Sequence, residues 1–265
     1  MRIKQVPTEL YVVTSSYQTA KVWNPQTNWS LITSYTGHSN WVIALEYITT
    51  DTMASSSNDR TIQIWTISTG LNVRTITSSS EIWSLKLLSD GVSLAGGEAG
   101  SQYGNSDIQI YNINTGSLIT TLSGHTNYVF DLALMNNNLL ASSSSDQTIR
   151  LWDLTTNTNT FILTGHTSDV NVLRVISEDI LASGSGDTTI KLWNTTSGLL
   201  IRTLSNHTDA IGMSVDLLND RQTLVSGSID QTIKLWNYKT GSLENSITTN
   251  INIRSLAVVV NPPRK

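Results

Sequence analysis

The sequence predicts an all-β protein built from repeated four-stranded sheets. The chain has four histidines, and each begins a set in which an aspartate and then a tryptophan follow. In three sets the aspartate lies 21 residues and the tryptophan 27 residues after the histidine; in the fourth these offsets are 23 and 29. Landmarks that recur about every 40 residues indicate a repeat architecture. The sets are His38, Asp59 and Trp65; His125, Asp146 and Trp152; His166, Asp187 and Trp193; and His207, Asp230 and Trp236.

Residues 165–204 show how one repeat is built. Alternating apolar residues predict a first strand within 165–176, and β-formers between turn residues predict short strands at 181–185 and 188–194. A fourth strand is predicted at 199–204, after a turn that contains glycine. The apolar period is 2 rather than 3.6, so strands are favoured over helices.

The turn that follows each third strand supports a count of six units. Five residues after the aromatic residue that ends the strand stands a glycine or an asparagine, the types that best tolerate a left-handed backbone. The six turn residues are Asn28, Gly70, Gly116, Asn157, Gly198 and Gly241. The six aromatic residues are Trp23, Trp65, Tyr111, Trp152, Trp193 and Trp236.

Two units depart from this pattern. The third has Ser78 in place of histidine, Asn105 in place of aspartate and an insertion at residues 98–106. The first has Tyr17 in place of aspartate, and residues 10–35 supply only three of its strands. We predict that residues 252–259 supply the fourth strand and close a ring, since an open ring would leave unpaired edges. Residues 1–265 are then one domain.

Composition excludes several classes of function. Only 14% of the residues are charged and the net charge is −4, so a basic stripe for general nucleic-acid binding is not expected. The absence of cysteine excludes disulfides and thiol catalysis. No secretory signal and no long apolar run are visible, so we expect no membrane association and an intracellular location, cytoplasmic or also nuclear.

The repeats resemble the WD40 family over nearly the whole chain. A Gly-His pair precedes the first strand at His38, His125 and His166, with Asn206 replacing the glycine before His207. The dipeptide Trp-Asp closes one third strand, at Trp152. The resemblance implies a β-propeller of four-stranded blades that acts as a rigid platform for protein recognition. The family more often has seven blades; we predict a closed six-bladed ring, and a truncated ring or one domain of a longer protein remain alternatives.

The His–Asp sets could suggest catalysis with a nearby serine. A catalytic triad occurs once in a protein, whereas this set occurs four times, so a structural role is favoured. The resemblance implies a buried network in each blade, in which aspartate, histidine, a serine and the tryptophan N–H are joined. Either Ser183 or Ser185 could be the serine, because both face the same way. Histidine spacing and loop composition match no metal site or phosphate loop, so we expect no metal, no cofactor and no enzymatic activity.

The resemblance also implies a partner-binding face, formed by the loops before the first strand and after the second strand of each blade. We predict a peptide or protein partner with apolar and basic residues, bound by an otherwise monomeric propeller within a larger assembly. The insertion at residues 98–106 is a candidate specificity loop. Packing of the aromatic rings between blades, a sensor domain and a small-molecule enzyme remain alternatives. The predicted contact residues are Trp41, Asn58, Glu81, Trp83, Tyr128, Phe130, Asp169, Asn171 and Arg254.

Overall fold

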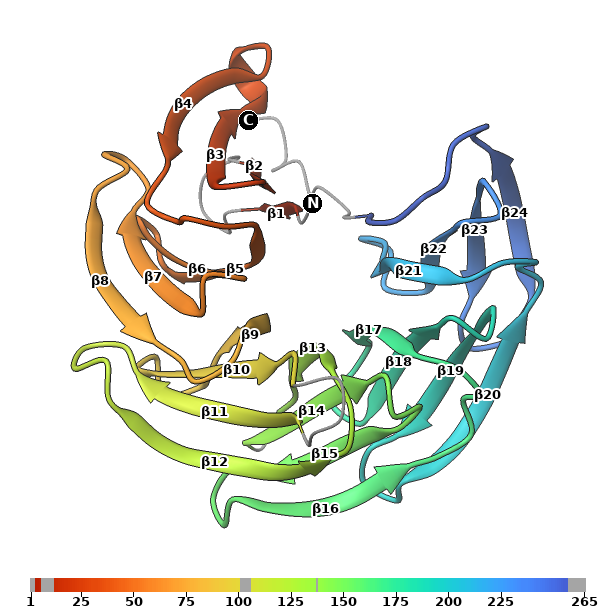
Figure 1. Ribbon diagram of the computed structural model, residues 1–265. Coiled ribbons are helices and arrows are strands. Elements are labelled where there is room, and N and C mark those ends of the chain that lie inside the picture. The colour runs from red at the N-terminus through yellow and green to blue at the C-terminus, as the bar shows by residue number, and fades with distance from the viewer. Residues whose placement is uncertain (1–2, 6–11, 101–105, 137, 257–265) are drawn as a thin grey trace. The chain divides into compact units, whose positions relative to one another are not determined.

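The structure, a computed structural model, describes residues 3–5, 12–100, 106–136 and 138–256. In these residues 24 strands form six antiparallel sheets of four strands each, and one short 3-10 helix, η1, spans Pro25–Thr27. The strands of each sheet follow one another in chain order (Figure 1). The predicted all-β class with six four-stranded blades is confirmed.

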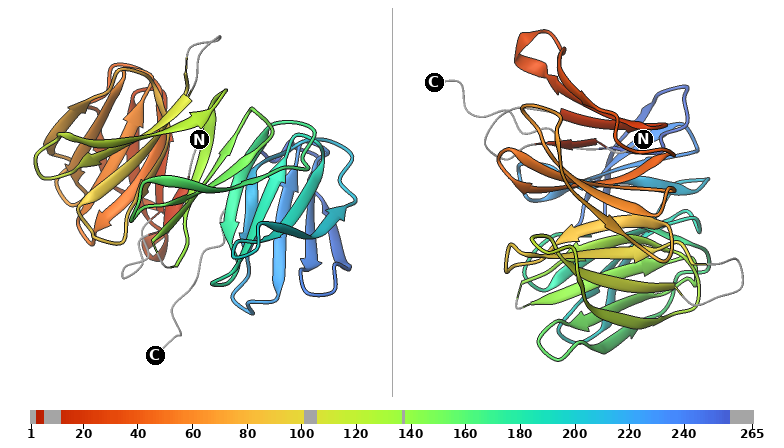
Figure 2. Two further views of the ribbon diagram at one scale, coloured as in Figure 1. Left: turned by 90° about the horizontal axis from the view of Figure 1, so that it is seen from below. Right: turned by 60° about the vertical axis from the view of Figure 1, so that its left-hand side comes forward.

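The chain divides into two compact units, of which the first extends to Ser123 and the second begins at Gly124. Figure 2 shows the twist of the sheets within each unit. The sheets of the first unit are β1 (Ile3–Gln5), β2 (Val12–Ser16), β3 (Thr19–Asn24) and β4 (Ser30–Tyr35); β5 (Val42–Thr49), β6 (Thr52–Ser57), β7 (Thr61–Thr66) and β8 (Asn72–Thr77); and β9 (Ile82–Leu87), β10 (Ser93–Glu98), β11 (Ser106–Asn112) and β12 (Leu118–His125).

The second unit holds the other three sheets. They are β13 (Val129–Leu134), β14 (Leu139–Ser144), β15 (Ile149–Asp153) and β16 (Thr158–Leu163); β17 (Val170–Val175), β18 (Ile180–Ser185), β19 (Thr189–Asn194) and β20 (Leu199–Ser205); and β21 (Ile211–Leu217), β22 (Thr223–Ser228), β23 (Thr232–Asn237) and β24 (Leu243–Thr248). The predicted strands of residues 165–204 match β17 to β20.

Within each unit, successive sheets pack as propeller blades do. The first strands lie beside one another: β5 beside β9, and β17 between β13 and β21. Trp193 at the end of β19 packs against Ile149, Leu151 and Leu163 of the preceding sheet. Trp236 repeats this contact on the sheet that holds β19. Burial of these indoles joins each sheet to its predecessor.

The six predicted turn residues all have the left-handed backbone. Their φ angles lie between 55° at Asn28 and 83° at Gly241. The glycine turns also lie against the preceding sheet: a methyl group added at Gly198 would clash with the ring of Phe161 on β16. Glycine therefore serves both the turn geometry and the contact between sheets at this position.

The prediction for the fourth strand of the first sheet is wrong. Ile3–Gln5 forms β1 and pairs antiparallel with β2, in the position that residues 252–259 were expected to fill. Because β1 and β2 are close in sequence, their pairing closes only a short loop and loses little chain entropy. Residues 252–256 lie instead beside β21, where Ser255 forms a parallel bridge with Met213. Residues 257–259 lie outside the described part of the chain.

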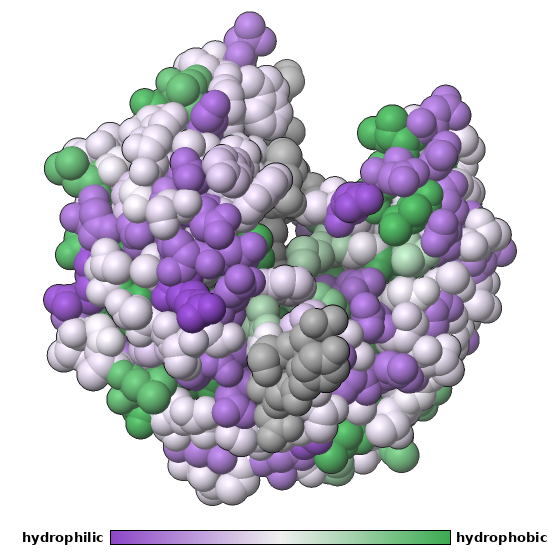
Figure 3. Space-filling model, viewed as in Figure 1, coloured by the Kyte–Doolittle hydropathy of each residue, from purple (hydrophilic) through white to green (hydrophobic). Residues whose placement is uncertain are grey.

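The outermost strand of each sheet carries exposed apolar side chains, for example Val73 on β8 and Leu199 on β20. On the first unit, most of the apolar residues visible in Figure 3 are separate spots near the outer edge, among residues of intermediate or hydrophilic character. No helix in the described residues is both long and apolar enough to span a membrane.

Candidate partner-binding surface and the networks beneath it

Four sheets contain a closed hydrogen-bond network, as the family resemblance implied. In the sheet of β17 to β20, Nδ1 of His166 lies 2.7 Å from Oδ2 of Asp187, and Nε2 lies 2.8 Å from Oγ of Ser183. The indole N–H of Trp193 donates to the same serine oxygen at 2.8 Å. One proton arrangement satisfies every group: Trp193 donates to Ser183, Ser183 to His166 and His166 to Asp187.

The serine of the network is therefore Ser183, and not Ser185. Ser185 lies two residues further along β18 on the same face, where its hydroxyl accepts the main-chain N–H of Asp187. Ser55, Ser142 and Ser226 take the place of Ser183 in the other three complete networks. Sequence could not distinguish the two serines, because the choice depends on where the histidine enters from the preceding loop.

Each aspartate accepts four hydrogen bonds. Asp230 accepts the N–H and hydroxyl of Thr232 on Oδ1, and His207 and the main-chain N–H of Thr208 on Oδ2. Burial alone would raise the pKa of Asp230, but these donors outweigh burial and lower it to about 2. The pKa values of Asp59, Asp146 and Asp187 are also lowered, for the same reason. The threonine two residues after the aspartate was missed in the sequence, although it recurs in all four sets.

The networks predict that acid destabilises the fold. Burial lowers the pKa of His38 and His207 below the ordinary value of 6.5, and their aspartates offset this only in part. The unfolded chain thus binds protons more readily, so stability is lost as pH falls below about 6.5, by up to about 1.4 kcal/mol per pH unit for each imidazole. A second loss is expected below pH 3.8, as pH approaches the lowered pKa of the aspartates. Urea unfolding at pH 7.5, 6.0, 5.0 and 3.0 measures both.

His207→Gln provides the control, because it removes one titrating imidazole. The slope of stability against pH between 6.5 and 5 is expected to be shallower in this variant, whatever its stability at pH 7.5. A slope equal to that of the wild type would contradict the assignment of this loss of stability to the histidines.

The first and third sheets contain other hydrogen bonds in place of the complete network. In the first, Trp23 donates to Thr14 at 2.9 Å, so threonine replaces the serine. In the third, Gln109 Nε2 donates to Glu98 Oε1 at 2.6 Å, and Gln109 Oε1 accepts the hydroxyl of Tyr111. Burial raises the pKa of Glu98, and its hydrogen bonds offset this only in part. Asn105 and residues 101–105 of the insertion lie outside the described part of the chain.

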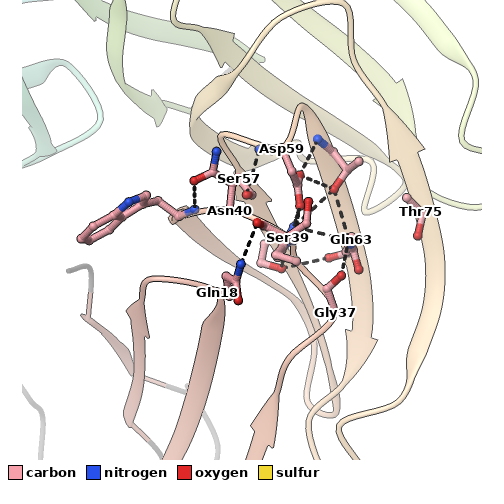
Figure 4. Close-up of polar contacts among 12 residues, drawn as sticks. Gln18, Gly37, Ser39, Asn40, Ser57, Asp59, Gln63 and Thr75 are labelled. Carbon is pink, nitrogen blue, oxygen red and sulfur yellow. Dashed lines mark hydrogen bonds and ion pairs between the residues drawn. The ribbon is translucent and has the colours of Figure 1, made fainter.

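Gln63 extends the network of the second sheet toward its loops (Figure 4). Its Nε2 donates to the carbonyl of Gly37 at 3.1 Å, while its Oε1 accepts from Tyr35 and Asn72. The same figure shows Gln18, from the turn between β2 and β3, whose amide donates to the carbonyl of Ser39 at 2.7 Å. These contacts hold the loop before β5 in one position between two sheets.

The structure brings the two sets of predicted surface positions together at one end of each sheet. The carbonyl of Trp41, at the start of β5, accepts the N–H of Asn58 in the loop after β6, at 3.0 Å. Equivalent bonds join Tyr128 with Ser145 and Asp169 with Gly186, each at 2.9 Å. We call the side chains at this end of the first unit, those of Tyr17, Trp41, Glu81 and Trp83, the aromatic surface.

Trp41 and Tyr17 are the most exposed members of the aromatic surface, and each residue is 54% accessible. Their rings meet edge to face, with centroids 5.3 Å apart and planes at 81°. Trp83 is half-buried, and its indole N–H donates to Oε2 of Glu81 at 3.3 Å. Sequence reasoning noted Tyr17 only as a departure from the repeat and missed its contact with Trp41.

In the second unit the predicted residues other than Arg254 are half-buried. Tyr128 and Phe130 are half-buried and meet edge to face at 6.4 Å. Asp169 accepts the hydroxyl of Ser145, and the amide of Asn171 donates to the carbonyl of Ile211 at 2.7 Å. Arg254 is exposed, and its carbonyl accepts the N–H of Met213. Within the described residues, no group of three or more histidine, aspartate or glutamate side chains is arranged to hold a metal ion.

Comparison with known proteins identifies the family. The model of the family described as "WD domain, G-beta repeat" matches residues 29–66, 116–153, 157–194 and 198–237, more than half of the chain. The chain belongs to the WD40 family. The four matched segments end with the third strands that carry Trp65, Trp152, Trp193 and Trp236, so each WD40 repeat here joins the last strand of one blade to three strands of the next.

Two curated proteins of Arabidopsis thaliana are similar to this WD40 chain over part of its length. Protein SPA1-RELATED 4 is 28% identical over 143 residues, which are 52% of this chain and 17% of that protein. Autophagy-related protein 16 is 31% identical over 114 residues, which are 42% of this chain and 21% of that protein. The matched regions thus span about a fifth or less of these relatives.

Proposed function

We propose that this WD40 chain is a non-enzymatic protein-interaction module, and that the aromatic surface of its first unit binds a peptide segment of a partner protein. The observation that carries the proposal is the exposed pair of Tyr17 and Trp41. Exposed apolar residues that cluster are typical of interaction sites, and aromatic residues dominate the energetics of protein interfaces.

Contacts on both sides of Trp41 support a preorganised site. The main-chain N–H of Trp41 donates to Oδ1 of Asn40 at 2.8 Å, and its main-chain carbonyl accepts the main-chain N–H of Asn58. The ring rests against Tyr17 from the neighbouring sheet. A partner would therefore meet rings that are already positioned, and binding would lose little side-chain entropy.

The charge beside these rings indicates the kind of ligand. Glu81 is half-buried next to Trp83, and aromatic faces attract cations. We therefore propose a peptide that places an aliphatic residue on the Tyr17–Trp41 pair and a lysine or arginine toward Glu81.

The use of the histidines argues against an enzyme. Both ring nitrogens of all four histidines are engaged, Nδ1 by an aspartate and Nε2 by a serine. None is available as a general base, and their role is to hold the blades. The names of the relatives specify no reaction, and one of them, autophagy-related protein 16, places that protein in autophagy.

Replacing Trp41 with alanine is expected to weaken peptide binding while leaving the fold intact. Peptides selected from a random display library on the wild-type chain are measured against each variant by fluorescence polarisation. We expect Trp41→Ala to weaken the selected peptides at least about tenfold, which is typical of an interface hot spot.

Trp29→Ala is the matched control, since Trp29 is also 54% exposed but lies beside the turn between β3 and β4. It is expected to bind as the wild type does. Equal loss in both variants, or no loss in Trp41→Ala with an unchanged melting temperature, would refute the aromatic surface as the site. A lower melting temperature in Trp41→Ala would place the ring in the core.

A further inference from the structure

We infer that the inner edge of β21 in the second unit is a binding site for an extended peptide, and that residues 251–256 occupy it as a ligand supplied by the chain itself. The site, here called the strand-acceptor site, consists of Gly212, Met213 and Ser214 on β21 with Gly227 and Ser228 on β22. Its ligand class is an extended segment with a β-branched aliphatic residue at the position of Ile253. This inference is independent of the aromatic surface.

A bulge in β21 creates the site. Ile211 pairs with Ser228 and Val215 with Ser226, so three residues of β21 stand opposite the single residue Gly227. The corresponding bulges of β13 and β17 each insert only one extra residue. In β13, Val129 pairs with Ser144 and Asp131 with Ser143; in β17, Val170 pairs with Ser185 and Val172 with Gly184. The longer bulge turns the main chain of Met213 away from the ladder with β22.

Residues 251–256 form hydrogen bonds with the main-chain N–H and carbonyl of Met213, which the bulge turns away from β22. The N–H of Met213 donates to the carbonyl of Arg254 at 3.0 Å, and the carbonyl of Met213 accepts the N–H of Leu256 at 3.3 Å. These two bonds define the parallel bridge between Met213 and Ser255. Peptides bind to sheet edges in the same way in other proteins, through main-chain bonds that are largely independent of sequence.

Two glycines make room for the ligand. A methyl group added at Gly212 would lie 2.8 Å from the carbonyl oxygen and 3.2 Å from Cα of Arg254. A methyl group at Gly227 would clash with Cγ2 and Cβ of Ile253. Gly212 thus allows the ligand backbone to approach, and Gly227 receives the isoleucine side chain.

Further bonds hold the backbone around Ile253. Its N–H donates to the carbonyl of Ser228 at 3.0 Å, and its carbonyl accepts the hydroxyl of Ser214 at 3.4 Å. By contrast, the side chains of Ile251, Asn252 and Arg254 are exposed, with Ile251 accessible to 65%. The site therefore binds mainly the main chain of the segment, and Gly227 receives the side chain of Ile253.

The same contacts make the ligand exchangeable. Within the described residues, three main-chain bonds, the hydroxyl of Ser214 and the half-buried Ile253 hold residues 251–256, whereas a strand inside a sheet is bonded on both edges. Segments with few buried apolar contacts open locally at low free-energy cost. A peptide of the same chemistry from a second chain can then replace residues 251–256.

The test uses the full chain with Ile253→Asp, which places a charge against Gly227 and releases the segment. Ile251→Asp is the matched control, since it puts the same charge on an exposed position two residues away. The first readout is the rate of tryptic cleavage after Arg254, measured by mass spectrometry. We expect cleavage at least about tenfold faster in Ile253→Asp than in the wild type and unchanged in Ile251→Asp, because main-chain bonds protect the scissile segment.

The second readout is binding of a fluorescent synthetic peptide with the sequence of residues 250–256, NINIRSL. We expect it to bind Ile253→Asp at least tenfold more tightly than the wild type or Ile251→Asp, where the site is occupied. A peptide with aspartate in place of its second isoleucine is expected not to bind. Ile253→Ala, a milder change, should show both effects in weaker form.

Three results would overturn the inference: equal cleavage in wild type and both Ile253 variants, no peptide binding to Ile253→Asp at an unchanged melting temperature, or equal binding to all three chains. Loss of the wild-type melting transition in both Ile253 variants would also overturn it, because residues 251–256 would then be an integral part of the fold.

Discussion

Replacing Trp193 with alanine is expected to lower the free energy of unfolding by about 3–5 kcal/mol, the usual range for removal of a buried aromatic residue. Trp193 is 1% exposed, and its side chain fills the space between its own sheet and the sheet of β13 to β16. The change would leave a cavity against Ile149, Leu151 and Leu163, and Ser183 would lose a donor. Because sheets in the unit are joined by such contacts, cooperativity should also decrease.

Urea unfolding followed by circular dichroism measures this loss. Trp29→Ala removes an indole that is 54% exposed and is expected to change stability by no more than about 0.5 kcal/mol. A loss below about 1 kcal/mol in Trp193→Ala, or similar losses in both variants, would show that the indole does not join the sheets.

Replacing Asp187 with alanine is expected to cost about 1–3 kcal/mol without affecting partner binding. The carboxylate accepts Nδ1–H of His166, the N–H of Thr167, and the N–H and hydroxyl of Thr189. Its removal leaves these donors without an acceptor in a part-buried site. His166 would also lose the partner that orients its ring toward Ser183.

Glu178→Ala is the control for charge, because Glu178 is exposed in the turn between β17 and β18. Melting temperatures and peptide binding are measured for both variants. An unchanged melting temperature in Asp187→Ala would refute the structural role of the network. Loss of peptide binding with unchanged stability would assign the aspartate to recognition instead.

Sequence was sufficient for the repeated part of the fold. The alternation within β17 to β20, the turn residues Gly198 and Gly241, and the pairing of His166 with Asp187 all depend on residues within one repeat. The departures in the first and third units were also visible, since Tyr17 and Ser78 break the pattern. The hydrogen bonds found there instead were not predicted, because such bonds can be made by several residue types. They involve Thr14 in the first sheet and Gln109 with Glu98 in the third.

The ends of the chain were harder to predict. Ile3–Gln5 is a strand of three residues, too short for a hydrophobic period to be recognised, whereas residues 252–259 carry a longer apolar pattern. Which segment pairs with β2 depends on the length of the loop that joins them and on whether another strand edge binds the same segment. The bulge of β21 offers residues 251–256 another partner, and part of the extra length of the fourth His–Asp offset lies in that bulge.

The sequence by itself predicted an all-β chain of six four-stranded blades, because the period of 2 and the turn residues recur within each repeat. The buried networks, found in four of the six sheets, were implied by the WD40 resemblance, and the structure decided which serine completes them. The exposure of the surface residues depends on contacts between sheets. Trp41 precedes β5 and is exposed against Tyr17, whereas Trp83 lies on β9 and is half-buried beside Glu81. The position of residues 251–256 likewise depends on main-chain groups of β21 that become available only when the sheet has formed.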